Sequence, residues 1–183
     1  MQYNFTNLKS ELKKVEEFLS KEYSQLSTGR ASPLVLDSIS VESYGARQPI
    51  KNVASISIED PKTLRIAPWD KNQIKSIEKA ILIADLGLSV ATDDAGIRVI
   101  FPQLTAETRQ KLVKVLKEKL EETRITVRRE RGNVWDEIQR MEKEGEMNED
   151  EKGRSKDELQ KVVDEVNNNL EAIFEKKEKE VIG

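Results

Sequence analysis

The segment RITVRRER, residues 124–131, places four arginines in eight positions of a chain whose formal net charge is -3. Guanidinium groups form paired, charge-assisted hydrogen bonds with phosphates, so this segment predicts a surface for a nucleic-acid backbone. On a helix with about 100° between residues, Arg124, Arg128 and Arg131 fall within roughly 60° of one another. We call these three residues the arginine ridge and expect it to be exposed beside the core.

Two neighbouring residues extend this expected surface. Trp135 follows the ridge by one helical turn and could offer a ring for base stacking, whereas Arg129 points nearly opposite to the apolar seam of the helix. A structural interpretation stays open beside the RNA-binding one. Three glutamates, Glu121, Glu122 and Glu130, stand at helical spacing from the arginines and could pair with them, and Trp135 could pack within a bundle.

Other chemistries have less support in the sequence. The chain has no histidine and no cysteine, so the most common general base, the most common zinc ligand and any thiolate nucleophile are missing. Carboxylates, lysines and tyrosines remain, but no acid pair has a defined spacing, and we expect no enzyme, no cofactor and no metal site. Asp93 and Asp94 could bind a cation, although their glycine-containing turn favours a turn role. The longest purely apolar run, residues 80–84, is too short to span a membrane, and we expect a cytoplasmic protein.

Three segments carry the apolar spacing of amphipathic helices. Residues 3–28 repeat apolar side chains at intervals of three and four, and residues 105–143 continue this pattern with Thr105 as the expected N-cap. A third helix starts at the expected N-cap Asn148, with Glu151 as its partner in a capping box. One long amphipathic helix cannot bury its seam alone, so we expect the three to form a bundle.

The intervening segment, residues 31–104, has a different pattern. Alternating apolar and polar residues, separated by glycines and prolines, predict short strands. In the stretch NVASISIED, we expect Val53, Ile56 and Ile58 to share one buried surface.

One helix is expected inside this segment. Asp70 is the predicted N-cap, Gln73 stands at the capping-box position, and Gly87 ends the helix. Its apolar face is predicted to comprise Ile74, Ile77, Ile81 and Ala84. Trp69, next to the cap, is expected in the core of the small domain.

The predicted fold class is α+β: a long three-helix bundle with an inserted small β/α/β domain on a two-stranded hinge. The bundle comprises residues 1–29 and 105–183, and the inserted domain comprises residues 31–104. The hinge is expected at Arg30, Ala31, Ser32, Pro33, Pro102, Gln103, Leu104 and Thr105. Three seams of comparable length can satisfy one another, so we expect a monomer.

Charge is unevenly distributed along the helical segments. Residues 105–131 hold nine Lys/Arg and five Asp/Glu, a net charge of +4, whereas residues 132–183 hold nine and sixteen, a net charge of -7. RNA responds to charge within a Debye length of about 8 to 10 Å, so an acidic chain can still bind RNA through a basic region.

The stretch STGRASPLVLDSISVESYG strongly resembles the signature of the bacterial ribosome recycling factor family, in which a TGRASP-like segment precedes a Val-Glu-Tyr-Tyr-Gly-like strand. Here Ser43 replaces the first of those two tyrosines. The resemblance continues through EDPKTLRIAPWD, KAILIADLGL, GIRVIFPQLT and EKEGEMNEDE, and thus covers essentially the whole chain in order.

This resemblance implies a function and an architecture. The family's fold is a three-helix bundle with a hinged β/α/β insert and a tRNA-like outline. Its members bind the ribosome after peptide release and, with the GTPase elongation factor G, separate the subunits and release mRNA and tRNA. The family has no active site of its own. Its bundle lies on large-subunit ribosomal RNA across the tRNA sites, and its smaller domain faces the GTPase.

The resemblance also implies site residues. The family's Val-Arg-x-x-Arg-Arg motif contacts ribosomal RNA, and Val127, Arg128 and Arg131 match it. Gly132 departs from the motif where a second adjacent arginine is common, and Trp135 departs from a small polar residue. One phosphate contact is therefore expected to be lost, or to be replaced by Trp135 stacking or by the neighbouring Arg129.

Arg109 and Arg30 are two further expected RNA contacts. Arg109 matches a basic position early in the same helix, and Arg30 lies at the exit of TGRASP, where a hinge-fixing ion pair is an equal alternative. A different class of function, a coiled-coil adaptor that pairs with a partner helix, also remains open. A bundle that satisfies all three of its own seams is less suited to that role.

Overall fold

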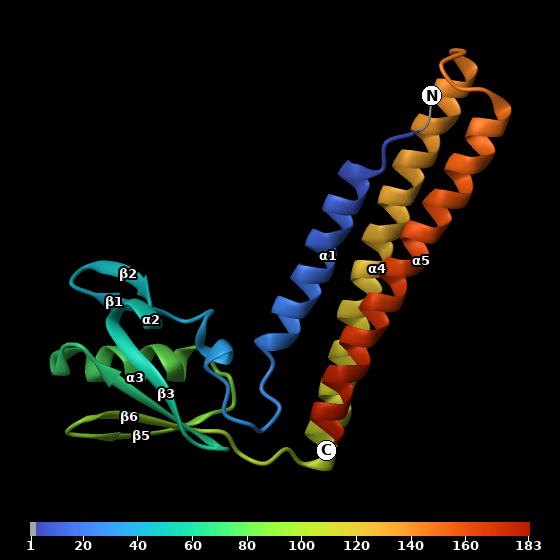
Figure 1. Cartoon of the computed structure of the whole chain (residues 1–183). Coiled ribbons are helices and arrows are strands. Elements are labelled where there is room, and N and C mark those ends of the chain that lie inside the picture. The colour runs from blue at the N-terminus through green and yellow to red at the C-terminus, as the bar shows by residue number, and fades with distance from the viewer. Residues whose placement is uncertain (1–2) are drawn as a thin grey trace. The chain divides into compact units, whose positions relative to one another are not determined.

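The computed structural model describes residues 3–183 and consists of two compact units (Figure 1). The helical unit combines the described residues up to Tyr23 with Gln110–Gly183, and the small unit comprises Ser24–Arg109. Both helices and strands are present, so the α+β prediction is confirmed.

The helical unit is a bundle of α1, α4 and α5. The bounds of these helices are Thr6–Ser24, Ala106–Lys143 and Glu149–Ile182. Contacts at the two ends of α1 show that it runs antiparallel to α4: Tyr3, just before α1, donates to Glu137, whereas the hydroxyl of Tyr23 donates to the carbonyl oxygen of Leu116 at 2.6 Å. The buried seam includes Leu8, Leu12, Leu19, Leu116, Leu120, Val127, Ile138, Leu159, Val163, Val166 and Leu170.

Helix α1 is shorter than the predicted helix 3–28: residues 3–5 and 25–28 lie outside it. The side chain of Asn4 accepts a hydrogen bond of 2.9 Å from the backbone N–H of Thr6. Beyond the other end, Gly29 adopts φ +78, and a Cβ there would lie 3.2 Å from the carbonyl oxygen of Pro102. A glycine is therefore required by both its backbone conformation and this close approach.

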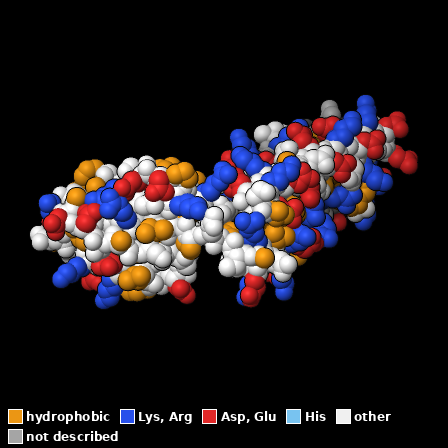
Figure 2. All heavy atoms as spheres, turned by 90° about the horizontal axis from the view of Figure 1, so that it is seen from below, with side chains coloured by type: hydrophobic (Ala, Val, Ile, Leu, Met, Phe, Trp, Pro, Cys, Tyr) orange, Lys and Arg blue, Asp and Glu red, His pale blue; other side chains and the backbone are white. Residues whose placement is uncertain are grey.

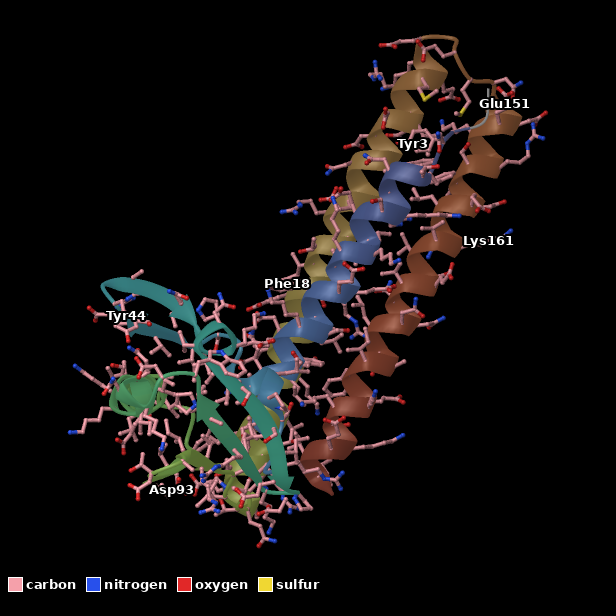
Figure 3. All side chains as sticks on the ribbon, turned by 60° about the vertical axis from the view of Figure 1, so that its left-hand side comes forward. Tyr3, Phe18, Tyr44, Asp93, Glu151 and Lys161 are labelled. Carbon is pink, nitrogen blue, oxygen red and sulfur yellow. The ribbon has the colours of Figure 1, made fainter. Side chains whose placement is uncertain are left out.

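The predicted caps of the two longer helices are confirmed. The hydroxyl of Thr105 accepts from the backbone N–H of Thr108 at 3.2 Å. Asn148 and Glu151 form a reciprocal capping box at the start of α5, at the end of the bundle where Figure 3 labels Glu151. The turn before it is packed against the bundle through Met147, which is 3% exposed.

The small unit contains an antiparallel four-stranded sheet in the order β3-β4-β6-β5, a separate β1–β2 hairpin and the helix α3 (Figure 1). Its strands are β1 Ser40–Ser43, β2 Ala46–Pro49, β3 Ala54–Asp60, β4 Thr63–Pro68, β5 Ser89–Asp93 and β6 Gly96–Ile100. Its helical segments are η1 Pro33–Leu36, α2 Ile50–Val53, η2 Lys71–Gln73 and α3 Ile74–Ile83.

The two faces of the sheet differ in character. Leu64, Ile66, Ile97 and Val99 are fully buried in a core that also includes Ile77 and Ile81 of α3, which confirms the predicted apolar face of that helix. Alternate residues on the same strands, Arg65 and Arg98, are directly opposite each other in the β4–β6 register. They pair with Asp93 and Glu59, so the other face is covered by a network of charges.

Three predictions for the small unit are wrong. Ile58 is 59% exposed, because β3 is an edge strand and Ile58 lies near its C-terminal end. Trp69 is 71% exposed rather than in the core. The capping box predicted at Gln73 is absent, because Gln73 forms no capping hydrogen bond; the predicted N-cap Asp70 is confirmed, since its side chain accepts from the backbone N–H of Asn72 at the start of η2, which continues directly into α3.

Candidate nucleic-acid interface

Helix α4 positions all four arginines of the segment 124–131 on one uninterrupted helix. The helix continues through Gly132, where an added Cβ would meet no atom within 4 Å. The helix surface next to Arg131 is therefore not covered by a side chain at position 132.

Two of the three residues of the arginine ridge contact α5. Arg124 is half-buried and its guanidinium pairs with Glu171. Arg131 is half-buried as well, and its Nη2 donates to Oε1 of Gln160 at 3.3 Å. The arginine ridge is thus less uniformly exposed than the helical spacing alone suggested, because α5 covers one side of it.

Arg128 and Arg129 point to solvent. Their side chains are 64% and 68% exposed, and their partners, Glu121 and Glu130, lie on the same helix. Exposed ion pairs of this kind contribute at most about 1 kcal/mol and are screened by salt. A phosphate can therefore replace either glutamate at little cost to the fold.

Trp135 contacts α5. Its side chain is half-buried, and Nζ of Lys156 lies 5.9 Å from the ring centroid in a cation–π contact. This geometry supports the bundle-packing interpretation of Trp135, since one ring face already has a partner.

Arg30 and Arg109 are exposed and belong to the small unit, whereas the arginine ridge belongs to the helical unit. Arg109 lies in the first turn of α4, where its backbone N–H donates to the carbonyl oxygen of Thr105 at 3.0 Å. Arg30 directly follows the constrained glycine, Gly29.

The titratable side chains of Tyr3, Tyr23 and Asp93 make contacts that belong to the fold. Burial and the neighbouring carboxylate of Glu137 raise the pKa of Tyr3 to about 12. Burial likewise raises the pKa of Tyr23 far above its ordinary value. Asp93 lies in a β-turn and pairs with Arg65, which agrees with the turn role expected for it.

Searches of residues 3–183 for two other kinds of site were negative. No group of three or more acidic, His or Cys side chains in this range could hold a metal ion. No helix in the same range is long and apolar enough to cross a membrane.

The charges of the exposed surface are mixed. Figure 2 shows Lys and Arg side chains interspersed with Asp and Glu over the helical unit. The basic excess of residues 105–131 therefore acts locally, through side chains such as Arg128 and Arg129, rather than as a large field of one sign.

Residues 19–182 match the family model described as ribosome recycling factor. The chain belongs to the ribosome recycling factor family. It is 42% identical to the ribosome-recycling factor of Clostridium kluyveri over 172 residues, which cover 94% of this chain and 93% of the relative. It is 40% identical to that of Natranaerobius thermophilus over 177 residues, covering 97% and 96% of the two chains.

Two solved structures support the same assignment. The solution structure of a ribosome recycling factor is 36% identical, with a TM-score of 0.77 and coverage of 97% of this chain and 95% of the other. The Thermus thermophilus factor, described in models with Escherichia coli elongation factor G bound to the E. coli post-termination complex, is 36% identical with a TM-score of 0.66 and coverage of 98% and 97%. The family name describes a translation factor rather than an enzyme.

The residues of α5 that contact the arginine ridge are not predicted by the sequence pattern. Glu171 and Gln160 contact Arg124 and Arg131 across the bundle. Helical periodicity shows which face of a helix is apolar, but it does not set how far one helix is shifted along another. These partners could have been found only from the register between α4 and α5.

Proposed function

We propose that this protein binds the post-termination ribosome and, together with the GTPase elongation factor G, separates the subunits and releases mRNA and tRNA. The supporting observation is the family match over residues 19–182, in a fold similar to that of a relative described with elongation factor G on the post-termination complex. The factor acts by binding and leverage in the cytoplasm, as a monomer, while the GTPase supplies the free energy.

Arg128 and Arg131 are the proposed centre of the RNA contact. Arg128 is exposed, and its guanidinium can bind a phosphate in place of the carboxylate of Glu121. Arg131 holds Gln160 through a hydrogen bond of 3.3 Å, a neutral partner that a phosphate can outcompete. Arg129, Arg30 and Arg109 are proposed as further contacts, since each is exposed.

Trp135 is proposed as a support for this surface rather than as a free stacking platform. Its contact with Lys156 ties α4 to α5 beside the arginine ridge. Because the side chain is only half-buried, part of it remains accessible to RNA.

The two connections, residues 30–33 and 102–105, are proposed as a hinge. Within the small unit, the backbone N–H of Ala31 donates to Pro61 at 2.9 Å, and that of Phe101 donates to Lys62 at 2.8 Å. Both connections are therefore hydrogen-bonded to the same turn, which joins β3 to β4. A pair of adjacent strands restricts the directions in which two domains can move.

Co-sedimentation with post-termination ribosomes over a salt series tests the RNA surface. Arg128→Ala/Arg131→Ala should bind weakly, and each lost phosphate contact should lower the magnitude of the log–log salt slope by about 0.7 to 0.9. Arg140→Ala/Lys143→Ala is the matched control, because it removes two charges near the other end of α4.

Three results are informative. Loss of binding and a shallower slope in the ridge variant alone would support the proposed surface. Equal binding of all three proteins would place the RNA contact elsewhere, near Arg30 and the small unit. If the wild type itself does not bind ribosomes, the proposed function is wrong, and the adaptor hypothesis should be tested with protein partners.

A further inference from the structure

Two arginines of α4 reach across the bundle to α5, and their partners differ in charge. Arg124 pairs with the carboxylate of Glu171, whereas Nη2 of Arg131 donates to the neutral amide oxygen of Gln160 at 3.3 Å. At about 100° and 1.5 Å per residue, the two arginines lie about 20° apart around α4 and about 10 Å apart along it. Glu171 and Gln160 also lie within about 20° of each other around α5. The two contacts therefore lie on the same side of the bundle.

The amide of Gln160 has a defined orientation. Its Nε2 donates to Oδ1 of Asp164, one helical turn further along α5, at 2.7 Å. An ionised carboxylate can only accept, so the nitrogen end of the amide faces Asp164 and Oε1 faces Arg131. A reversed amide would place N–H groups against the guanidinium, which has only donors. Asp164 therefore holds Gln160 in the orientation that accepts from Arg131.

Arg131 keeps most of its hydrogen-bonding capacity. Its contact with Gln160 uses Nη2, and no ion pair of Arg131 is found in residues 3–183. Nη1 and Nε can therefore form the paired hydrogen bonds with which a guanidinium binds phosphate. The contact restricts the half-buried side chain without neutralising its charge. A side chain that is already restricted loses less entropy when it binds.

Arg124 has a different environment. Its charge is offset by Glu171, and the two side chains are 37% and 42% exposed, compared with 64% and 54% for Arg128 and Glu121. Solvent therefore screens the Arg124–Glu171 pair less. Glu171 also lies close to Tyr23, since, after burial, its negative charge is the next cause of the raised pKa of that residue. A phosphate must displace a better-held carboxylate to reach Arg124 than to reach Arg128.

We propose that Gln160 is a positioning residue that keeps Arg131 available to an RNA phosphate, and that Glu171 withholds Arg124 from the same RNA. The partner that α5 presents thus selects which arginine of the ridge binds. This inference rests on the proposed ribosome binding and deepens it, because it assigns the selection of contacts to a helix that carries none of the ridge residues.

Exchanging the charges of the two partners tests the proposal, by co-sedimentation with post-termination ribosomes over a salt series. Gln160→Glu gives Arg131 an anionic partner. Binding should then weaken about tenfold or more, and the magnitude of the log–log salt slope should fall by about 0.7 to 0.9, as for the loss of one phosphate contact. Glu171→Gln should release Arg124, so both quantities should change in the opposite direction.

A changed charge near RNA also acts at a distance, so each exchange is repeated without its arginine. Gln160→Glu should have little effect when combined with Arg131→Gln, and Glu171→Gln should have little effect when combined with Arg124→Gln. Asn168→Asp is the control for an added charge, because it converts another exposed amide of α5 into a carboxylate and should leave binding nearly unchanged.

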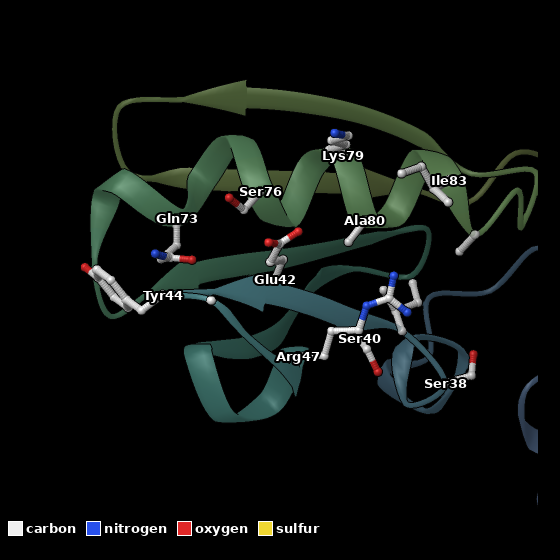
Figure 4. A pocket seen from close by; sticks show the side chains of 13 residues that line it. Ser38, Ser40, Glu42, Tyr44, Arg47, Gln73, Ser76, Lys79, Ala80 and Ile83 are labelled. Carbon is white, nitrogen blue, oxygen red and sulfur yellow. The ribbon is translucent and has the colours of Figure 1, made fainter.

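An arginine of the small unit controls for the loss of a positive charge as such. Arg47 lines a groove between the β1–β2 hairpin and α3 (Figure 4), and no hydrogen bond or ion pair of its side chain is found in residues 3–183. Arg47→Gln removes the same charge as Arg131→Gln and should leave the salt slope unchanged.

The proposal is overturned if either exchange leaves binding unchanged, or if its effect has the same size with and without the corresponding arginine. Wild-type binding without this coupling refutes the present proposal alone, whereas a wild type that does not bind ribosomes refutes the proposed function as well. A purely structural role of Gln160 would change stability instead, so a lowered melting temperature with an unchanged salt slope also counts against positioning.

Discussion

Arg65 on β4 and Asp93 at the end of β5 face each other through two hydrogen bonds of 2.7 Å, one from each terminal guanidinium nitrogen. Arg98 on the intervening strand β6 also reaches Asp93, at 3.4 Å, and binds Glu59 on the other edge strand. The network therefore links all four strands of the sheet on its outer face.

Asp93→Asn should destabilise the small unit in a pH-dependent manner. The hydrogen bonds from Arg65 hold the pKa of the Asp93 carboxyl well below its usual range. A folded pKa below the unfolded value of about 3.9 means that the stabilisation is complete above that value and is lost as pH falls through the folded pKa. The stability difference between wild type and variant should thus be constant from about pH 5 to 7 and shrink below about pH 4.

Urea unfolding at several pH values, followed through NMR signals of β4 and β6, measures this difference. Asp94→Asn removes the same charge from the same turn, and no ion pair of Asp94 is found within residues 3–183. A difference that does not change between pH 3 and pH 6, or an equal effect of the control, would contradict the assigned role of Asp93.

Tyr23→Phe should cost about 1 kcal/mol of stability, because it removes the buried hydrogen bond to the carbonyl oxygen of Leu116 while keeping the ring. For a chain of this size, the melting temperature should fall by about 2 to 4 °C. Tyr3→Phe is the comparison, since its hydroxyl binds Glu137 at the surface and its removal should change stability by less than about 0.5 kcal/mol. A melting temperature unchanged by Tyr23→Phe would show that the bond adds nothing net.

Gly96→Ala should be strongly destabilising, by at least about 3 kcal/mol. Gly96 has φ +150, and a Cβ there would lie only 2.2 Å from the carbonyl oxygen of Ile66. Gly45→Ala separates the two causes, because Gly45 has φ +80 but no atom within 4 Å of an added Cβ. Chemical denaturation should show a smaller loss for Gly45→Ala, and similar losses for both would argue against the close approach as the main cause.

Gly132→Ala should stabilise α4 by about 1 kcal/mol, since alanine has a higher helix propensity and its Cβ would meet no neighbour. The melting temperature should rise by about 2 to 4 °C. Gly153→Ala, in α5 and equally unobstructed, should act in the same direction. A decrease caused by Gly132→Ala alone would indicate that the helix needs glycine at this position.

Most predictions that depend on local interactions are confirmed, although the capping box predicted at Gln73 does not form. The caps at Thr105 and at Asn148–Glu151, and the apolar face of α3, depend on residues within a few positions of each other. The same alternation misplaced Ile58, because a period of two identifies a strand face but does not reveal that the strand lies at an edge.

The details of the RNA surface depend on contacts that are distant in sequence. Helical spacing predicts that Arg124, Arg128 and Arg131 share one side of the helix, but the partner of Arg124 is 47 positions away and that of Arg131 is 29 positions away.

The contact between Tyr23 and Leu116 joins residues that are 93 positions apart, whereas α4 and α5 are connected by one short turn. During synthesis at about 5 to 20 residues per second, Leu116 is made roughly 5 to 20 s after Tyr23. Through that interval, the apolar face of α1 has no bundle partner, and the small domain is completed first. A nascent chain of this protein therefore exposes Leu8, Leu12 and Leu19 to solvent or chaperones until α4 emerges.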